Sequence, residues 1–509
     1  MASMVNLSPS RGQIAIATVI AAASIAFYGK AFVNRASCYA LSLALPGTVT
    51  FPFSSNYTAF VESYLVAQQS EIFPACVVSP GSASEVSTAV SVLSAINSFT
   101  RQVKFAIRGG GANTNMGSSS LKDGIIINLQ ALSQIEVTRD RQVASLGAGL
   151  KWGPVYRELE KMGLTVAGGR VSTIGVAGVA LGGGMSFLSP KHGFTCDNVI
   201  NFEVVLANGS IVNANATSNP DLWKALRGGS NNFGIVTRFD MRALPQGELW
   251  GGGFVTEIST LPESLRAFHE MTTDPNYDEN ASLILAFGFN WGSWFVMNQV
   301  HYAKPVENPP FAHPLTGIEP KLFSNLMVGN LSAHTDIMAS YSPIAQRRIY
   351  ITTTTKSDLE LFSRFLEIVK ARTQGLERVK DAVISLTMQP MPPIMFKASE
   401  ATGGNSLGIK SQDAPVVNVL FTAAWGNASD DDAFFRAGRE VIEDIEKLAK
   451  SQGKSHRYKY MNYAAGSQDP ITGYGPEIKA FLQDTSKKYD PKGLFQKAVP
   501  GGFKLFREV

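Results

Sequence analysis

The sequence feature that most constrains the fold is a run of three glycines, Gly109–Gly111, directly after the strand-like stretch Phe105–Arg108. Glycine tolerates positive φ values and lets the backbone approach a ligand closely. Successive backbone N–H groups in such a loop can form a concave anion site. The segment therefore predicts a place for a pyrophosphate. The next residue is Ala112, which has no nucleophile.

Two further glycine-rich segments follow, at Gly168–Met185 and Arg227–Thr237. Each is flanked by strand-like sequence, which indicates a shared role in close contact between backbone and ligand. No segment contains G-x-G-x-x-G at the start of a helix, so the dinucleotide fold that needs this fingerprint is disfavoured. The alternative is that all three segments are only turns.

The bulk composition excludes several classes of protein. The 509 residues suffice for two or three domains with a large core, and 45% hydrophobic against 17% charged residues is typical of a globular protein. The net charge is +4 with no long basic run, so we expect no nucleic acid partner. The six histidines lack metal-ligand spacing, which predicts no catalytic metal. The sequence has no G-x-S-x-G motif with a partnered catalytic triad, so a hydrolase is not favoured.

The N-terminus predicts entry into the secretory pathway. Arg11 precedes an apolar run, Ile14–Tyr28, which is shorter than the roughly 20 residues that span a bilayer. We interpret residues 1–36 as a signal peptide; an uncleaved signal anchor, the one expected membrane contact, is the alternative. The N-x-S/T motif, compatible with secretion although some matches arise by chance, occurs at Asn56, Asn208, Asn215, Asn280, Asn330 and Asn427.

The chain has three cysteines, Cys38, Cys76 and Cys196. A disulfide persists in the oxidising compartment that a signal segment implies. We favour the pair Cys38–Cys76, because Cys38 follows the signal and Cys76 opens a predicted strand. Connectivity cannot be deduced from sequence alone.

Hydrophobic spacing predicts a mixed α+β chain that changes character near Trp250. Up to about Leu244, short strands alternate with helices; beyond Trp250, strand-like runs are separated by long helical patterns. The expected strands lie at Pro74–Pro80, Gly124–Leu129, Ile135–Val137, Ser282–Phe289, Trp294–Val300 and Val416–Ala424. The expected helices lie at Ser84–Asn97, Trp152–Lys161, Asp358–Thr373 and Asp430–Gln452. Residues 38–68 read as an entry segment in which Leu45-Pro46-Gly47 and Pro52 break any long element.

Together these segments resemble one known family. The glycine-rich segments, with Cys196–Val199, Glu203–Gly209 and Asn219–Trp223, are similar to those of the berberine-bridge-enzyme-like flavoenzymes of the vanillyl-alcohol-oxidase superfamily. The tail motifs Tyr460–Ala464 and Tyr489-Asp490-Pro491 resemble the family's C-terminal segment. The resemblance covers nearly the whole chain from Cys38 and is closest to the fungal secondary-metabolism members.

The resemblance implies an α+β fold with a two-subdomain PCMH-type FAD-binding domain and an α+β substrate domain with an antiparallel sheet. The expected boundaries are 37–245 for the FAD domain, 246–455 for the substrate domain and 456–509 for a C-terminal segment returning to the FAD domain. A disulfide like Cys38–Cys76 also occurs in the family. The implied FAD contacts are Arg108, Gly109, Gly110, Gly111, Ala112 and Asn113 at the pyrophosphate; Thr173, Ile174, Gly175, Gly178, Gly182, Gly183 and Gly184 along the flavin; Ile235 and Val236 at the nucleotide end; and Asn462 and Tyr463 at the ring.

The chain departs from the family at the positions that bond FAD covalently. The histidine position of many relatives holds Ala112, and the cysteine position falls near Val171. Cys196 aligns with a non-linking position, and a small buried cysteine is the simpler interpretation. His192 is a possible substitute linker or base, with an ordinary loop histidine as the alternative. We therefore expect FAD bound non-covalently.

The resemblance implies an FAD-dependent oxidase or dehydrogenase that acts on a small-molecule biosynthetic intermediate by hydride transfer to flavin N5, with molecular oxygen as a further partner. Tyr463 is the candidate catalytic base, although a tyrosine that only packs against FAD is the alternative. Gln389 is a further candidate to face the site. A cyclase with a structural flavin, or a secreted binding protein that has lost catalysis, are the competing hypotheses; the retained glycine segments argue against the last.

Overall fold

The computed structural model describes residues 30–341 and 345–506. The apolar run at Ile14–Tyr28 lies outside these residues. Within the described part of the chain, no helix has the length and apolar character needed to cross a bilayer. Helix α2 (Lys30–Ala44) begins within residues 1–36, the segment expected to be a signal peptide or anchor.

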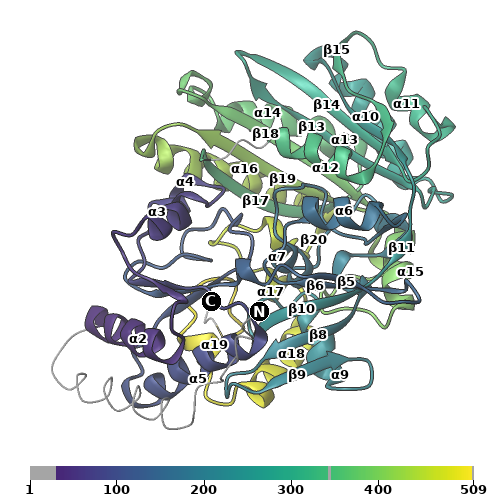
Figure 1. Ribbon diagram of the computed structural model, residues 1–509. Coiled ribbons are helices and arrows are strands. Elements are labelled where there is room, and N and C mark those ends of the chain that lie inside the picture. Colours follow the sequence, from purple (N-terminus) through teal and green to yellow (C-terminus); the bar gives the residue numbers. More distant parts are fainter. Residues whose placement is uncertain (1–29, 342–344, 507–509) are drawn as a thin grey trace.

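Two small sheets organise the first part of the chain (Figure 1). The first sheet has the order β1 (Val49–Thr50), β2 (Cys76–Val78), β4 (Ile125–Asn128) and β3 (Phe105–Arg108), with parallel pairing of β2 and β3 to β4. The second has the order β5 (Ile135–Val137), β6 (Val143–Gly147), β10 (Ile235–Arg242), β8 (Val199–Val205) and β9 (Ile211–Asn215), all antiparallel. A short pair, β7 (Leu164–Thr165) with β11 (Leu244–Pro245), lies beside them.

Helices surround these sheets, and most of them share one hydrophobic core with the sheets. Helix α3 (Ser55–Glu62) instead packs in a smaller cluster with Val77, Ala106 and Ile126 of the first sheet. Buried side chains such as Leu93, Ile127 and Phe239 belong to the shared core, which also takes in the C-terminal Phe495. The helices are α2, α3 (Ser55–Glu62), α4 (Ala67–Ser70), α5 (Ala83–Thr100), α6 (Trp152–Glu160), α7 (Val176–Leu181), α8 (Ser189–His192), α9 (Pro220–Leu226), and the late α17 (Pro470–Gly473), α18 (Pro476–Tyr489) and α19 (Leu494–Lys497).

A large antiparallel sheet occupies the upper half of Figure 1. Its order is β15 (Lys321–Ser324), β12 (Leu249–Glu257), β14 (Ser293–Tyr302), β13 (Ala281–Asn290), β18 (Val383–Met391), β19 (Val416–Trp425), β17 (Arg347–Lys356) and β20 (Ser455–His456), with β16 (Met327–Gly329) beside β12. One face packs on helices in a second core that contains Phe287, Leu386 and Phe421. The helices of this region are α10 (Leu261–Thr273), α11 (His313–Thr316), α12 (Leu331–Ser340), α13 (Leu359–Ser363), α14 (Phe365–Arg372) and α16 (Asp431–Ser451). Helix α15 (Pro393–Ala401) lies in the lower half of Figure 1, where it packs on α8 and contributes Met395 and Phe396 to the first core.

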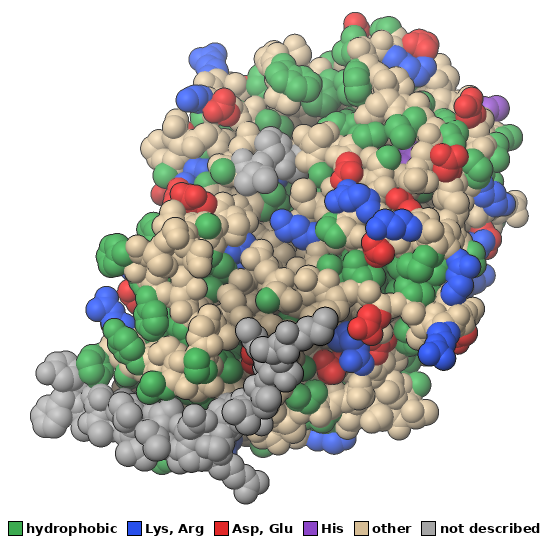
Figure 2. Space-filling model, viewed as in Figure 1, with side chains coloured by type: hydrophobic (Ala, Val, Ile, Leu, Met, Phe, Trp, Pro, Cys, Tyr) green, Lys and Arg blue, Asp and Glu red, His purple; other side chains and the backbone are tan. Residues whose placement is uncertain are grey.

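The chain returns to the lower half after β20, where residues 456–506 join the first core. The other face of the large sheet is thereby placed opposite the glycine-rich segments. On the face of the molecule that Figure 2 shows, Lys and Arg side chains are interspersed with Asp and Glu. Hydrophobic side chains gather at the lower left, over the region of α2 and α3.

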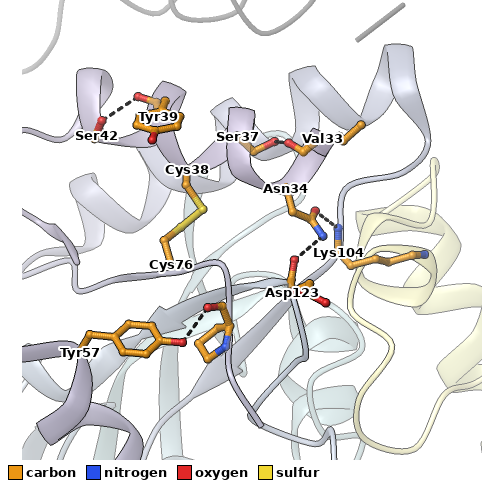
Figure 3. The surroundings of a disulfide bond; sticks show 11 residues. Val33, Asn34, Ser37, Cys38, Tyr39, Ser42, Tyr57, Cys76, Lys104 and Asp123 are labelled. Atoms are coloured by element: carbon orange, nitrogen blue, oxygen red, sulfur yellow. Dashed lines mark hydrogen bonds between the residues drawn. A yellow bond between two sulfur atoms is a disulfide. The ribbon is translucent and has the colours of Figure 1, made fainter. Parts of the chain in front are cut away.

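The predicted disulfide is present and fastens α2 to the first sheet (Figure 3). Cys38 lies on α2 and Cys76 opens β2, with their Cα atoms 6.0 Å apart. The side chain of Asn34, also on α2, donates to the carbonyl of Asp123 and accepts from the Lys104 N–H. The breaks expected at Leu45-Pro46-Gly47 and Pro52 lie between α2 and α3, although neither helix was expected.

Candidate cofactor and active site

A cavity of about 320 Å³ lies where the three glycine-rich segments, the tail and strand β17 meet. Most of the residues expected to contact FAD line it, although they come from segments far apart in the chain. Those lining residues are Gly109, Gly110, Gly111, Ala112, Asn113, Ile174, Gly175, Gly178, Gly182, Ile235, Val236, Asn462 and Tyr463.

Close backbone contact joins the first two glycine-rich segments. A Cβ atom built on Gly110 would lie 2.5 Å from the Cα of Gly175, and one built on Gly175 would lie 2.6 Å from the Cα of Gly110. Gly111 has a φ of +68°, which side-chain-bearing residues rarely adopt. Glycine is required here because two loops approach each other, which explains why the glycines cluster.

Asn462, in the C-terminal segment, holds the second glycine-rich segment in place by hydrogen bonds. Asn462 donates from Nδ2 to the carbonyl of Gly178 at 2.9 Å and accepts from the N–H of Gly184 at 3.3 Å. A Cβ on Gly182 would lie 2.7 Å from the Asn462 amide. Asn462 therefore holds α7 and the turn after it in place at the edge of the cavity.

Gln69 and Asn115 hold the loop that follows the first glycines. The buried amide of Gln69 donates to the carbonyls of Asn113 and Asn115 and to Ser118 Oγ. Asn115 in turn donates to the carbonyl of Ala464 at 2.9 Å. This buried network fixes the backbone around Ala112 although neither Gln69 nor Asn115 lines the cavity.

Four of the expected contacts do not line the cavity. Arg108 turns away from it: its guanidinium stacks on the rings of Phe60 and Tyr64, at 4.5 and 3.9 Å from their centroids, and donates to the carbonyls of Phe60 and Ser63. Arg108 thus supports the loop from below, under Gly111. The other residues that do not line the cavity are Thr173, Gly183 and Gly184.

Tyr463, Arg170 and Gln389 meet at one end of the cavity. Nη2 of Arg170 donates to the phenol oxygen of Tyr463 at 2.9 Å and also to Oε1 of Gln389. The ring of Tyr463 packs edge-on against Tyr350 and Tyr460, with centroids 5.9 and 4.8 Å apart. These contacts fix both the position and the hydrogen bonding of the Tyr463 hydroxyl.

The cavity carries positive charge. Within the described part of the chain its charged lining residues are Arg170 and Arg348, and no Asp or Glu lines it. Arg170 is 8% exposed, and neither partner of its Nη2 is a carboxylate. Burial raises the pKa of Tyr460 well above its ordinary value, so that phenol stays neutral at physiological pH.

Comparisons with known proteins identify the chain. Residues 74–215 match the model of the FAD binding domain family. The FAD-dependent monooxygenase tpcD of Cochliobolus heterostrophus is 38% identical over 89% of this chain and 89% of its own length. The FAD-dependent monooxygenase FUP4 of Fusarium proliferatum is 35% identical over 93% of this chain and 95% of its own.

Solved structures agree on the fold. The BBE-like 1 protein of Physcomitrella patens has a TM-score of 0.72 at 20% identity, covering 92% of this chain and 100% of its own. The chain belongs to the same family of fungal FAD-dependent enzymes as the Cochliobolus and Fusarium relatives, and it has the fold of the berberine-bridge-enzyme-like protein. The 6-hydroxy-D-nicotine oxidase of Arthrobacter nicotinovorans has the same fold, with a TM-score of 0.75 at 19% identity over 91% of this chain and 98% of its own.

The lining residues suit FAD. Backbone segments without side chains approach one another at Gly110 and Gly175, which leaves room for a ligand beside them. Among the described residues no carboxylate lines the cavity, so none would repel the two phosphates of that cofactor. The expectation of an FAD-dependent oxidoreductase with this fold is thus confirmed.

The two positions that the resemblance assigns to covalent links hold no histidine or cysteine. The glucooligosaccharide oxidase of Acremonium strictum, described with a 6-S-cysteinyl, 8α-N1-histidyl FAD, has a TM-score of 0.74 at 18% identity, covering 93% of this chain and 100% of its own. Here Ala112 and Val171 line the cavity. Cys196 is buried elsewhere, and burial raises its pKa. His192 lies at the end of α8, outside the cavity lining.

The sequence did not identify Arg170, Tyr350 or Arg348 as site residues. Arg170 lies inside a quoted glycine-rich segment, as a lone arginine between two glycines and a valine. This exception in an apolar stretch is the one signal from which a site role was predictable. Tyr350 and Arg348 lie on β17, whose run of β-branched residues at Ile349–Thr355 is typical of a strand.

Proposed function

We propose that this berberine-bridge-like enzyme oxidises a small-molecule intermediate of secondary-metabolite biosynthesis, with FAD held non-covalently. The observation that carries the proposal is the hydrogen-bonded set of Tyr463, Arg170 and Gln389 at the end of the cavity. Residues 37–245 with 456–509 form the FAD-binding part in this proposal, and residues 246–455 form the substrate-binding part.

In this reaction Tyr463 accepts the proton of a substrate O–H while the adjacent C–H leaves as hydride. Bound FAD supplies the hydride acceptor, and molecular oxygen takes up the two electrons as hydrogen peroxide. Arg170 donates to the phenol oxygen at 2.9 Å, so its charge favours the proton transfer by stabilising negative charge on that oxygen during this step. Gln389 holds the Arg170 guanidinium in that position.

The lining of the cavity supports non-covalent attachment. Among the described residues, no histidine or cysteine lines it, and the two linking positions hold Ala112 and Val171. Acid precipitation of the purified protein tests this directly. We expect a colourless pellet and yellow FAD in the supernatant; yellow colour that stays in the pellet would refute the proposal.

Tyr463→Phe tests the catalytic role of Tyr463. An extract from a producing strain that lacks this enzyme supplies the accumulated substrate. Mixed anaerobically with the wild-type holoenzyme, it should bleach the flavin, and the variant should bleach about 100-fold or more slowly with the same flavin content. Tyr489→Phe, whose hydroxyl contacts Asp221 outside the cavity, is the matched control. Equal bleaching by both variants would mean that Tyr463 only packs.

A cyclase with a structural flavin is the second candidate function. The fold is that of enzymes with covalently bound FAD, but the proposed site lacks both linking residues. This favours a cyclase, because a structural flavin does not need a reduction potential raised by a covalent bond. The same anaerobic mixture decides: product that forms without bleaching establishes the cyclase, whereas bleaching in step with product establishes the oxidase.

Secretion is the proposed route of the chain. The Cys38–Cys76 disulfide is typical of oxidising compartments. Asn34 and Val33 are buried on α2, so removal of a signal must occur before them to preserve the fold.

Among the sequons, Asn280 is buried and its side-chain amide donates a hydrogen bond to Asp278, so we expect no glycan there. Peptide mapping of the secreted protein tests both the cleavage point and the glycans.

A further inference from the structure

The outer side of helix α2 is largely apolar and open to solvent. Phe32, Arg35, Tyr39 and Leu43 recur at helical spacing and so form one stripe along the helix. All four are exposed, Tyr39 by 63% and Leu43 by 54%. Single apolar residues are normal on a protein surface, whereas a contiguous apolar stripe indicates contact with a partner.

The inner side of α2 prevents the helix from turning this stripe inward. Val33, Leu41 and Ala44 are buried in the first core. Cys38 points from α2 toward Cys76 in Figure 3, and the disulfide between them fastens the helix to the first sheet. The stripe is therefore a fixed feature of the surface.

The loop after β1 extends the stripe. The ring of Phe51 stacks on Tyr39 with centroids 5.3 Å apart, so this loop lies beside α2. Two residues later, Phe53 is fully exposed and has a φ of +71°, which a bulky residue rarely adopts. Backbone strain under a protruding ring points to a role outside the fold. With Phe32 and Leu43, these three side chains form the α2 face, where hydrophobic side chains gather in Figure 2.

The charges that accompany the α2 face are positive. The sequence from Met1 to Val61 has three basic residues and no Asp or Glu. Arg35 stands within the stripe, and an arginine can rest its alkyl stem on an apolar layer while its guanidinium reaches a phosphate. An acidic residue that contacts α2, Asp123, does so on the inner side, where the buried Asn34 donates to its carbonyl. A carboxylate would be costly beside lipid tails and anionic headgroups, so this charge pattern suits a bilayer surface.

Continuity with the N-terminal sequence favours a lipid partner over a protein. The apolar run Ile14–Tyr28 ends two positions before α2 begins at Lys30. A run of this kind enters a membrane, either before cleavage or as an anchor, and would bring the start of α2 to the bilayer surface. Tyrosine and phenylalanine rings are favoured in the interfacial layer of a bilayer. A protruding ring such as Phe53 needs a matching pocket in a protein partner but none in a fluid bilayer.

We propose that the α2 face docks on the surface of a phospholipid bilayer, with Tyr39, Leu43 and Phe53 in the interfacial layer and Arg35 at the headgroup phosphates. The folded protein itself makes this contact, which is therefore distinct from an N-terminal anchor. The contact goes beyond the proposed oxidation and does not depend on it.

Site-specific fluorescence on the full-length holoenzyme tests the contact. Phe53→Cys adds one reactive thiol, since Cys38 and Cys76 form a disulfide and Cys196 is buried. This thiol is labelled with nitrobenzoxadiazole, whose emission rises in an apolar layer. The vesicles contain phosphatidylcholine and phosphatidylserine at about 4:1, to include an anionic surface. We expect the emission to rise severalfold with vesicles and to be quenched by nitroxides on the lipid acyl chains.

Trp291→Cys, labelled in the same way, is the matched control. Trp291 is also a bulky aromatic residue with positive φ, +50°, and is 89% exposed. It lies on the turn between β13 and β14, in the large sheet rather than beside α2. Its label should not respond to vesicles. Equal responses at positions 53 and 291, or no response at 53, would overturn the proposal. A rise at position 53 that needs no lipid and grows with protein concentration would assign the α2 face to a second copy of the chain and overturn it as well.

Flotation with the same vesicles measures the strength of the contact. The triple variant Tyr39→Ser/Leu43→Ser/Phe53→Ser should bind about tenfold or more weakly, because it loses apolar area that the bilayer removes from water. Trp291→Ser should bind like the wild type. The N-terminal sequence is the same in all these proteins, so its own contribution cancels. The three substituted side chains are exposed, and an unchanged urea midpoint verifies the fold. Wild-type affinity in the triple variant would refute the docking surface.

Arg35→Gln tests the polar part of the contact. Wild-type protein should bind vesicles with phosphatidylserine more tightly than vesicles of phosphatidylcholine alone, and the variant should lose part of that preference. Added salt should reduce the preference of the wild type in the same way, because it screens the attraction. A preference that is the same in variant and wild type would show that Arg35 does not reach the headgroups.

Discussion

Gly110 and Gly175 touch backbone to backbone, although 65 positions separate their residue numbers, 110 and 175. The contact brings the first two glycine-rich segments together as two walls of one cavity. Neither residue has room for a Cβ atom, so the contact depends on glycine at both positions.

We expect Gly110→Ala and Gly175→Ala each to lose most of the bound FAD, because a Cβ 2.5 to 2.6 Å from the facing Cα would push the two walls apart. The measurement is visible flavin absorbance per protein after gel filtration. Gly247→Ala is the control, since nothing lies within 4 Å of its added Cβ. A Gly110→Ala variant with full flavin content would show that the two glycine-rich segments can move apart without loss of FAD binding.

Gln389→Leu should lower the free energy of unfolding by about 1–3 kcal/mol, because the Arg170 N–H that it accepts becomes a buried donor without a partner. Gln389→Glu keeps an acceptor oxygen and supplies a counter-charge, so its stability should lie close to that of the wild type. Urea unfolding followed by fluorescence measures both. A leucine variant as stable as the wild type would mean that water or another group replaces Gln389.

Removal of the Cys38–Cys76 disulfide should destabilise the protein by about 3–4 kcal/mol, from the chain entropy of the 38-residue separation that it closes. The Cys38→Ala/Cys76→Ala double variant should therefore melt well below the wild type. A reducing agent should lower the melting temperature of the wild type and leave that of the double variant unchanged, since Cys196 is buried and unpaired. An equal decrease in the melting temperature of both proteins would mean that the reducing agent acts on a sulfur outside the Cys38–Cys76 disulfide.

His192 predicts a pH dependence of stability. Burial, with a smaller effect of Lys191, lowers the pKa of its ring from 6.5 to about 4. Between these values the unfolded chain binds more protons than the folded protein, so stability is lost as the pH falls from about 6.5 toward 4. After allowance for solvent screening of a partly exposed ring, we expect about 2 kcal/mol. His192→Asn should remove this slope; parallel stability curves for variant and wild type would contradict it.

Hydrophobic spacing along the chain predicted several of the helices and strands, because their formation depends on residues close together in the sequence. The helical spacing of Ser84–Asn97 corresponds to α5, and the strand at Ser282–Phe289 corresponds to β13. The pattern at Asp358–Thr373 predicted one helix, whereas the structure has α13 and α14, divided at Arg364. The predicted Asp430–Gln452 helix matches α16 within one residue at each end.

Helix α2 was missed because its two sides do not differ in polarity. Leu41 on the inner side is buried, yet Tyr39 and Leu43 on the outer side are apolar as well and more than half exposed. A helix without a polar face shows no clear period, and Pro46 beyond its end suggested a broken segment. The proline does mark the end of the helix, but it says nothing about the residues before it.

The polar end of the site was beyond sequence reasoning for a different reason. Arg170 is 219 residues from Gln389 and 293 residues from Tyr463, so no spacing in the chain relates them. Taken alone, Arg170, Gln389 and Tyr463 could each be explained by their immediate sequence context. Only Gln389 and Tyr463 were named as candidates to reach the site. Folding of the large sheet and of the tail against the glycine-rich segments makes them neighbours.

The bridge made by Asn462 determines when the protein can acquire its colour during synthesis. Gly184 and Asn462 are 278 residues apart, so at typical translation rates of about 5–20 residues per second the ribosome adds the asparagine on the order of tens of seconds after the glycine. Until then, one wall of the cavity has no clamp. Flavin loading is therefore expected to be a late event that follows synthesis of the C-terminal segment.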